Sequence, residues 1–299
     1  MVSALQFIIS FITILVMPVS TQSINNEKLK KQISDELAKQ PGVYAVAFKN
    51  LSTGEELLIN EHFSYHAAST MKTPVLIEAY KQAAANKFAL TDSILIHNEF
   101  KSIVDGSVYS LDLKDDSEPE LYAKVGSKVP LKELLYQMII RSSNLATNLM
   151  IELVGAKNVT KTMRRLGAKN THVLRGVEDS KAYQKGLSNT LTAYDLMRIF
   201  TRLAEGKVVN KDASEQMITI LLDQKFKDLI PAKLPAEVKV AHKTGWITGT
   251  RHDSGIVYLP DGRKYVLVLM SKGITDDKAG IHAMATVSRL IYDHVIGKK

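Results

Sequence analysis

The chain has 299 residues, of which 45% are hydrophobic and 23% are charged, and these proportions exclude a disordered, collagen-like or coiled-coil protein. It contains no cysteine, which excludes disulfides, thiolate metal sites, a thiol nucleophile and thiol redox chemistry. Lys and Arg exceed Asp and Glu by 39 to 31, but the basic residues are scattered without an interleaved aromatic stripe, so we expect no nucleic-acid partner.

Residues Leu5–Met17 form an uncharged, mostly apolar run of 13 residues. This length suits the core of a signal peptide, whereas a membrane span needs about 20 residues. Small residues follow at positions 19–21, although no Lys or Arg precedes the run. We expect residues 1–22 to be a signal peptide and the protein to be exported, either periplasmic or secreted, without stable membrane insertion. An uncleaved anchor is the alternative.

The first part of the mature chain contains a helical pattern followed by extended ones. Leu29, Ile33 and Leu37 recur every four residues, which predicts a helix. Val43–Lys49 and Glu56–Ile59 are rich in β-forming residues and flank a turn, which predicts a hairpin.

The middle of the chain is mainly helical in pattern. A helix is expected from Thr70 to Asn86, with Pro74 in its opening turns. Lys101–Lys128 shows no helical period and is either a lid or binding loop or a mobile surface insertion, and Arg175–Asn189 is a second polar loop. Further helices are predicted over Leu131–Ile140, Leu145–Val154, Leu191–Glu205, Ala213–Asp223 and Ile281–Val295, and strands over Glu237–Lys243, Ser254–Leu259 and Tyr265–Ser271.

Strands are therefore predicted at both ends of the chain and helices between them. The economical arrangement is an α/β fold of the α+β type. It has a five-stranded antiparallel sheet built from both chain ends, flanked by the terminal helices, with an inserted all-helical subdomain. We expect residues 23–66 and 225–299 to form the two parts of the α/β subdomain and residues 67–224 to form the helical one.

Ser69 and Lys72 form the one SxxK pattern of the sequence, at the predicted start of a helix. Residues at this spacing share a helix face, so the amine can take the hydroxyl proton. The positive end of the helix favours the negative charge that develops. A single SxxK nevertheless arises by chance in most chains of this length.

Ser142 and Asn144 form an SxN pattern at the corner between two predicted helices. A second SxN, Ser23 to Asn25, lies directly after the leader, so the pattern alone carries little weight. A serine at this corner is also an ordinary helix cap.

Lys243, Thr244 and Gly245 form the one KTG pattern, at the end of a predicted strand. Glycine lets the backbone approach a ligand closely. Lys and Thr can then bind a substrate carboxylate while a backbone N–H points at a developing oxyanion. The competing interpretation is an ordinary strand end with an exposed lysine.

The order SxxK, SxN, KTG is the set found in class A β-lactamases and penicillin-binding proteins. Nearly the whole chain after the leader resembles a class A serine β-lactamase. The resemblance implies the β-lactamase/transpeptidase-like form of the predicted fold, a small-molecule β-lactam substrate and no cofactor or metal. We also expect a monomer. The resemblance rests on the contexts Ala68-Ser69-Thr70-Met71-Lys72, Ser142-Ser143-Asn144 with Asn148, and His242-Lys243-Thr244-Gly245.

The resemblance also implies a role for each motif residue. Ser69 is the nucleophile that carries the acyl group, and Lys72 accepts its proton with a pKa that the nearby Lys243 cation depresses. Ser142 delivers a proton to the leaving nitrogen. Asn144 binds the side-chain amide of the substrate, and Lys243 and Thr244 bind its carboxylate. The N–H groups of Ser69 and Trp246 form the oxyanion hole, beside Gly245. Arg251 is a further charge near the carboxylate.

Glu178 is the implied base for hydrolysis of the acyl-enzyme. It lies 36 residues after Ser142, a spacing similar to that of the family's loop glutamate. The chain departs from the family pattern at two points: the Glu-x-x-Leu-Asn context is absent, and Ser143 replaces the usual Asp of the middle motif. A loop carboxylate paired with Arg175 is the competing interpretation of Glu178.

We therefore expect a serine β-lactamase that hydrolyses β-lactam antibiotics through an acyl-enzyme. One alternative is a small penicillin-binding DD-peptidase that acts on cell-wall peptides, and a carboxylate acting on the acyl-enzyme would distinguish the two. Another is a penicillin-sensing module that acylates without turnover, which would need a transmembrane anchor and a partner domain.

Overall fold

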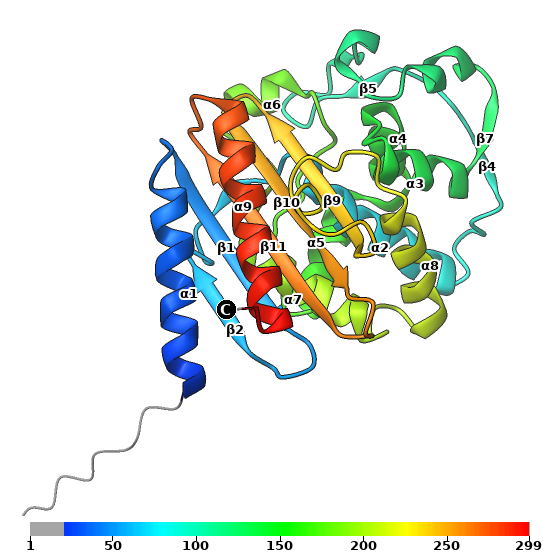
Figure 1. Cartoon of the computed structure of the whole chain (residues 1–299). Coiled ribbons are helices and arrows are strands. Elements are labelled where there is room, and N and C mark those ends of the chain that lie inside the picture. The colour runs from blue at the N-terminus through cyan, green and yellow to red at the C-terminus, as the bar shows by residue number, and fades with distance from the viewer. Residues whose placement is uncertain (1–20, 299) are drawn as a thin grey trace, which may run out of the picture.

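The two ends of the chain meet in one sheet. The computed structural model describes residues 21–298, and its main sheet is antiparallel with the strand order β2-β1-β11-β10-β9 (Figure 1). The register of β1 against β11 places Val43 opposite Lys272 and Asn50 opposite Tyr265. The predicted five-stranded sheet from both chain ends is thus confirmed. Its strands are β1 (Val43–Asn50), β2 (Glu56–Ile59), β9 (Lys239–Ile247), β10 (Thr250–Tyr258) and β11 (Lys264–Lys272).

Helices cover both faces of this sheet. The terminal helices α1 (Thr21–Leu37) and α9 (Asp277–Ile296) lie side by side on one face, and α7 (Ala193–Ala204) packs on the other (Figure 1). In β1, Val46 and Phe48 belong to the core under the terminal helices, whereas their neighbours of odd number face the helical part. This alternation follows from the two-residue side-chain period of a strand.

The helical part surrounds α2 (Lys72–Ala84), which packs against α4 and α5. Val75, Leu76 and Ile77 of α2 are all buried, so this helix forms the centre of the larger core. Three two-stranded ribbons pair β3 (Tyr65–His66) with β8 (Thr190–Leu191), β4 (Ser93–Leu95) with β7 (Lys128–Pro130), and β5 (Phe100–Lys101) with β6 (Val108–Tyr109). The other helices are η1 (Ala68–Met71), η2 (Leu113–Asp115), η3 (Pro119–Lys124), α3 (Leu131–Ile140), α4 (Asn144–Val154), α5 (Ala156–Arg165), α6 (Ser180–Gln184) and α8 (Lys211–Leu222).

Three helical predictions need correction. Helix α6 lies within the stretch Arg175–Asn189, which was expected to be a polar loop. Helix α5 was not predicted, because its buried apolar positions are few, Val159 and Met163, among polar residues. The predicted helix from Leu191 begins two residues later, since Leu191 pairs in β8 and the Thr192 side chain caps α7 by accepting the N–H of Asp195.

The prediction that Lys243-Thr244-Gly245 ends a strand is also wrong. Strand β9 continues to Ile247, because β10 begins at Thr250 and pairs with this whole stretch. The motif therefore lies within a strand, where the pairing partner holds its backbone.

The insertion Lys101–Lys128 is hydrogen-bonded to the second polar loop. The carboxylate of Asp179 accepts the Ser102 hydroxyl and the Ile103 N–H, both at 2.9 Å. The hydroxyl of Tyr109 donates to the carbonyl of Val177 at 3.2 Å. Of the two alternatives for this segment, these contacts favour a binding loop.

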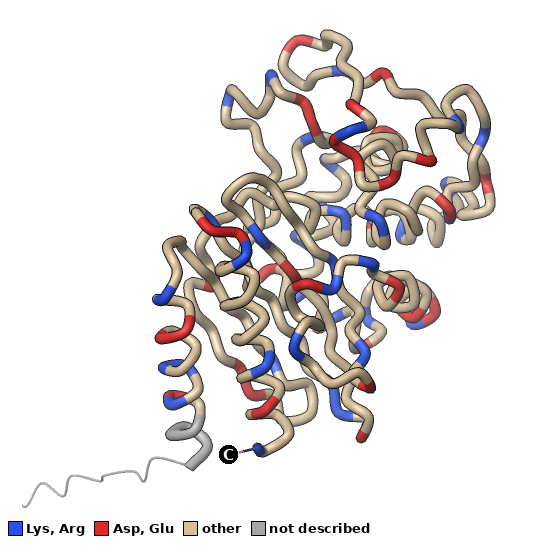
Figure 2. Tube along the Cα trace, turned by 45° about the horizontal axis from the view of Figure 1, so that its top comes forward, with Lys and Arg blue, Asp and Glu red and all other residues tan. Residues whose placement is uncertain are grey.

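Charge is spread over the molecule. Lys and Arg occur over both the sheet and the helical part, as the scattered sequence positions indicate (Figure 2). The predicted leader lies outside the described residues, except that positions 21 and 22 open α1. None of the helices within residues 21–298 is long and apolar enough to cross a membrane. The predicted division of the chain after residues 66 and 224 stays a prediction.

We expect the Ile33→Ala variant to lower the free energy of unfolding by about 2–5 kcal/mol, because Ile33 of α1 is fully buried against the sheet. Urea titration followed by circular dichroism measures this. Lys31→Ala, at an exposed position of the same helix, should stay within about 0.5 kcal/mol of the wild type. Equal effects of the two substitutions would contradict the docking of α1.

Candidate active site

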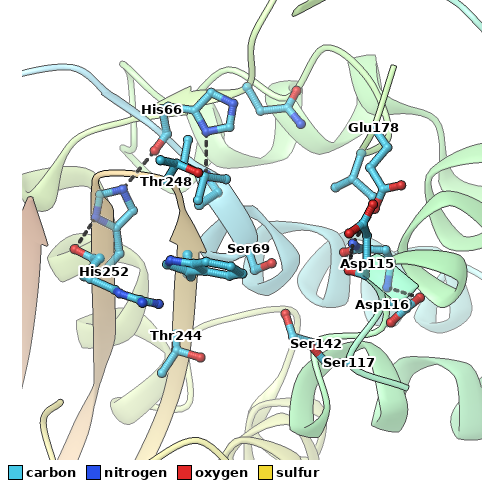
Figure 3. Close-up of a pocket in the computed structure, with 18 of the residues that line it drawn as sticks. His66, Ser69, Asp115, Asp116, Ser117, Ser142, Glu178, Thr244, Thr248 and His252 are labelled. Carbon is cyan, nitrogen blue, oxygen red and sulfur yellow. Dashed lines mark hydrogen bonds between the residues drawn. The ribbon is translucent and has the colours of Figure 1, made fainter. Parts of the chain in front are cut away.

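Ser69 lies in the short helix η1, directly before α2. The preceding residue, Ala68, has a φ of 44°, a left-handed conformation that costs about 1–3 kcal/mol in a non-glycine residue. The Nδ1 atom of His66 accepts the Ala68 N–H at 3.1 Å and helps to hold this turn. As a result the Ser69 hydroxyl points into the cleft, toward that of Ser142 (Figure 3). The sequence analysis did not identify His66, since a lone histidine carries no motif.

Gly245 of β9 passes directly beside Ser69. A Cβ atom at Gly245 would lie 3.1 Å from the backbone nitrogens of both Ser69 and Thr70. A larger residue here would have to push the strand and the turn apart by a few tenths of an ångström. Because β9 is the outermost strand of the described sheet, alternate N–H groups along its free edge are available to the cleft.

The amine of Lys72 is fully buried and has three acceptors. It donates to the Ser142 carbonyl at 2.6 Å, the Ser142 hydroxyl at 3.1 Å and Oδ1 of Asn144 at 2.9 Å. Burial lowers the pKa of Lys72 to about 7, against the opposing effect of Asp116 and Glu178. Burial is thus the main cause of the low pKa of Lys72, whereas the sequence analysis expected the charge of Lys243 to be the cause.

Ser142 lies between the two motif lysines. Its Oγ accepts from Lys72 and from Lys243, each at 3.1 Å. Since both lone pairs of this oxygen are then occupied, its own proton is free to point into the cleft. Lys243 is fully buried as well, and burial followed by the charge of Lys72 holds its pKa well below the usual range, while Asp253 opposes the shift.

Asn144 connects Lys72 to Glu178. Its Oδ1 accepts from Lys72 at 2.9 Å, and its Nδ2 donates to Oε1 of Glu178 at 2.6 Å. Burial raises the pKa of Glu178, the Asn144 hydrogen bond lowers it, and the neighbouring Asp116 raises it further.

The cap interpretation of the SxN corner also holds, because the Ser143 side chain accepts the N–H of Ala146 at the start of α4.

The alternative pairing of Glu178 with Arg175 is wrong. Arg175 donates instead to the carbonyls of Leu187 and Gly176, each at 2.9 Å. Among the described residues it has no hydrogen bond or ion pair with Glu178, so the glutamate is free to face Asn144.

The loop that carries Glu178 is held by Asn148 of α4. Its Oδ1 accepts the Val177 N–H at 2.6 Å, and its Nδ2 donates to the Val177 carbonyl at 3.1 Å. A Cβ atom at Gly176 would lie 2.3 Å from that Oδ1, so this close approach requires glycine. The hydroxyl of Tyr109, in the insertion, donates to the same Val177 carbonyl, and no sequence pattern predicts this contact.

Trp246 and Arg251 form one unit at the edge of the cleft. The Trp246 side chain is 58% exposed, which excludes a core role for it. The guanidinium of Arg251 lies 4.8 Å from the centre of the indole ring and donates to Asp277 at 2.8 Å. Arg251 therefore braces the indole while its charge is paired with Asp277.

Most of the predicted site residues line one cleft of about 750 Å³ between the sheet edge and the helical part, while Lys72 and Lys243 lie behind Ser142, to which both are hydrogen-bonded. Ser69, Ser142, Asn144, Glu178 and Thr244 all line it (Figure 3). No group of three or more His, Asp or Glu side chains among the described residues is arranged to hold a metal ion. The Ser69 hydroxyl and the Glu178 carboxylate thus face a single space, and the buried Lys72 amine is hydrogen-bonded to Ser142 in its wall. This arrangement suits acyl transfer followed by hydrolysis.

The sequence model of the β-lactamase enzyme family matches residues 28–295. The chain belongs to this family. One relative is a β-lactamase of Bacteroides uniformis, 27% identical over 69% of this chain and 76% of that protein. Another is the extended-spectrum β-lactamase PER-1 of Pseudomonas aeruginosa, 25% identical over 92% of this chain and 90% of its own.

Solved structures confirm the predicted β-lactamase-like fold. The β-lactamase of Sphaerobacter thermophilus superimposes with a TM-score of 0.77 at 24% identity, covering 88% of this chain and 97% of that one. The structure of PBP-A gives a TM-score of 0.77 at 26% identity, covering 90% of this chain and 96% of its own.

We expect Gly176→Ala to displace Asn148 and break its two hydrogen bonds to Val177, because the new Cβ atom would overlap Asn148 Oδ1. Hydrogen exchange of the Val177 amide should then accelerate about tenfold or more. Gln184→Ala is the control in the same loop, since Gln184 is exposed. Unchanged exchange at Val177 in Gly176→Ala would show that Asn148 does not hold this loop.

Proposed function

We propose that this protein is a serine β-lactamase that opens β-lactams through an acyl-enzyme on Ser69 and hydrolyses that ester with a water activated by Glu178. The observation that supports this most strongly is a connected hydrogen-bonded chain of Lys243, Ser142, Lys72, Asn144 and Glu178. Three of its members, Ser142, Asn144 and Glu178, line the same cleft as Ser69. This hydrogen-bonded chain joins the groups for acylation to the group for deacylation. Membership of the β-lactamase enzyme family agrees with it.

Acylation uses Lys72 as the base. A neutral amine has two N–H donors and one lone pair, so Lys72 must exchange one of its three acceptors for the Ser69 hydroxyl. The Ser69 proton moves to Nζ while Oγ bonds to the lactam carbonyl carbon. The oxyanion forms between the N–H groups of Ser69 and Trp246, where each donor contributes a factor of about 10²–10³ in rate.

Collapse of this intermediate breaks the lactam C–N bond. The leaving nitrogen takes the Ser142 proton, and Ser142 regains a proton from Lys72, to which it is hydrogen-bonded at 3.1 Å. Lys243 and Thr244 bind the substrate carboxylate, and the Trp246 and Arg251 unit forms the wall beyond them. Asn144 offers its side-chain amide to the acyl substituent.

Deacylation uses Glu178. Its carboxylate takes a proton from a water molecule as that oxygen attacks the ester, and Ser69 recovers its proton when the C–O bond breaks. The raised pKa of Glu178 makes it a stronger base than an exposed carboxylate. A carboxylate in this position favours the β-lactamase over the DD-peptidase and the sensor, neither of which needs it.

We also propose that residues 1–22 direct export to the periplasm or outside the cell and that the mature enzyme is a monomer. The apolar run Leu5–Met17 supports the first part.

We expect Glu178→Gln to keep a fast burst of one equivalent and then to stall with the acyl-enzyme intact, because only deacylation uses this carboxylate. The steady-state rate should fall about 10²–10⁴-fold. Stopped-flow assay with a chromogenic cephalosporin and intact mass measure the two phases. Asp228→Asn, which changes an exposed carboxylate lining the same cleft, should turn over normally.

Unchanged turnover in Glu178→Gln would assign the base elsewhere. A wild-type protein that itself stalls after one equivalent would contradict the β-lactamase proposal and favour the peptidase or the sensor.

We expect the acylation rate to fall about tenfold per pH unit below about pH 7. The rate falls at low pH because the base needs a free lone pair. Below its pKa of about 7, Lys72 is an ammonium and cannot accept the Ser69 proton. The charged groups around this amine are Asp116, Glu178 and Lys243. Pre-steady-state burst rates between pH 5 and about 9 measure the profile. An acid limb near pH 4 would contradict a lysine base and point to a carboxylate.

A further inference from the structure

Asp116 is a buried carboxylate that the mechanism above does not use. It belongs to the insertion, between η2 and η3, and it lies at the N-terminus of α4. Its Oδ2 accepts the N–H groups of Asn144 and Leu145, both at 2.9 Å, and the Tyr122 hydroxyl at 3.0 Å. Its Oδ1 accepts the Glu118 N–H at 3.0 Å.

These bonds complete the N-terminus of α4. A helix leaves its first four N–H groups without partners inside the helix. The Ser143 hydroxyl accepts one of them, from Ala146, and the Gln137 carbonyl accepts that of Ser143 itself. Asp116 accepts the other two, from a position 28 residues before Asn144. A carboxylate thus reaches this helix end from the insertion, whereas the residue at the middle of SxN is a neutral serine.

Asp116 also determines where Asn144 lies. The backbone of Asn144 is bound by this carboxylate, and its side chain contacts both Lys72 and Glu178. The negative charge at Asp116 raises the pKa of Lys72, against the effect of burial, and it raises that of Glu178. One side chain therefore acts on the acylation base and on the deacylation base.

We propose that Asp116 is a positioning residue of this active site, which fixes Asn144 between Lys72 and Glu178 and supplies a negative charge near the Lys72 amine. It does not touch the substrate in this role. The kinetic consequences rest on the proposed function, whereas the effect on the Lys72 amine does not.

The direct test is the titration of the Lys72 side chain in Asp116→Asn, followed by the ¹³Cε chemical shift in lysine-labelled protein and assigned with Lys72→Arg. Removing the negative charge should lower the pKa of Lys72 by about half a pH unit or more. Asp112→Asn is the matched control, because Asp112 caps η2 in the same insertion but is exposed. It should leave the titration of Lys72 unchanged.

The kinetic test compares the acid limb of the acylation rate in the same variants. In Asp116→Asn this limb should move to lower pH, because the pKa of Lys72 falls. The plateau rate should fall about tenfold as Asn144 shifts. A purely structural cap would lower the melting temperature without moving the limb.

The double variant Asp116→Asn with Ser143→Asp returns a carboxylate to the same helix end, since the Ser143 Oγ lies 3.4 Å from Oδ2 of Asp116. It should recover the wild-type Lys72 titration and acid limb, and it decides the question if the single variant does not fold. A Lys72 titration that is the same in folded Asp116→Asn as in the wild type overturns the proposal, as does a double variant that fails to recover. Absence of acylation in the wild type would instead refute the proposed function, while the titration still tests Asp116.

Discussion

Two lysine amines are held out of water on either side of one serine hydroxyl, and the rest of the catalytic centre depends on that arrangement. A buried ammonium is costly unless it is surrounded by acceptors and opposite charge. Lys72 has three oxygen acceptors, and Lys243 has the Ser142 hydroxyl and the Thr244 carbonyl. Those acceptors come from the α3–α4 corner and from β9, while Lys72 itself is on α2. No single segment can supply them all, so the sheet and the helical part must meet here.

The same constraint explains why two loops are attached so firmly to α4. Asn148 holds Val177, which places Glu178 within reach of Asn144. The insertion contributes Asp116 to the helix N-terminus and Tyr109 to the Val177 carbonyl. A base for deacylation is useful only if its distance from the ester is fixed, and these hydrogen bonds fix the loop from two sides.

Sequence patterns predicted the parts that are local. The two-residue period of the terminal strands and the four-residue period of Leu29, Ile33 and Leu37 were enough for the sheet and α1. Ser69 and Lys72 are only three residues apart, so one short pattern contains both, and its order with SxN and KTG indicated shared chemistry. Helix α5 was not predicted because most of its residues are polar and only a short apolar side, Val159 and Met163, is buried.

The contacts that could not be predicted join residues far apart in the chain. Asp116 and Asn144 are 28 residues apart, and Tyr109 and Val177 are 68 apart, so no short pattern contains both partners. The pairing of Arg251 with Asp277 is of the same kind. The cause of the low Lys72 pKa was also misjudged, because burial is a property of the packed structure and cannot be counted from nearby charges.

The covalent bond to Ser69 is the claim on which the chemistry depends most directly. Rapid acid quenching of the protein after mixing with a penicillin, followed by intact mass and peptide mapping, measures it. The mass should increase by that of the whole antibiotic, on the peptide that contains Ser69, and Ser69→Ala should gain nothing. An adduct on any other residue, or one that survives in Ser69→Ala, would contradict the assignment.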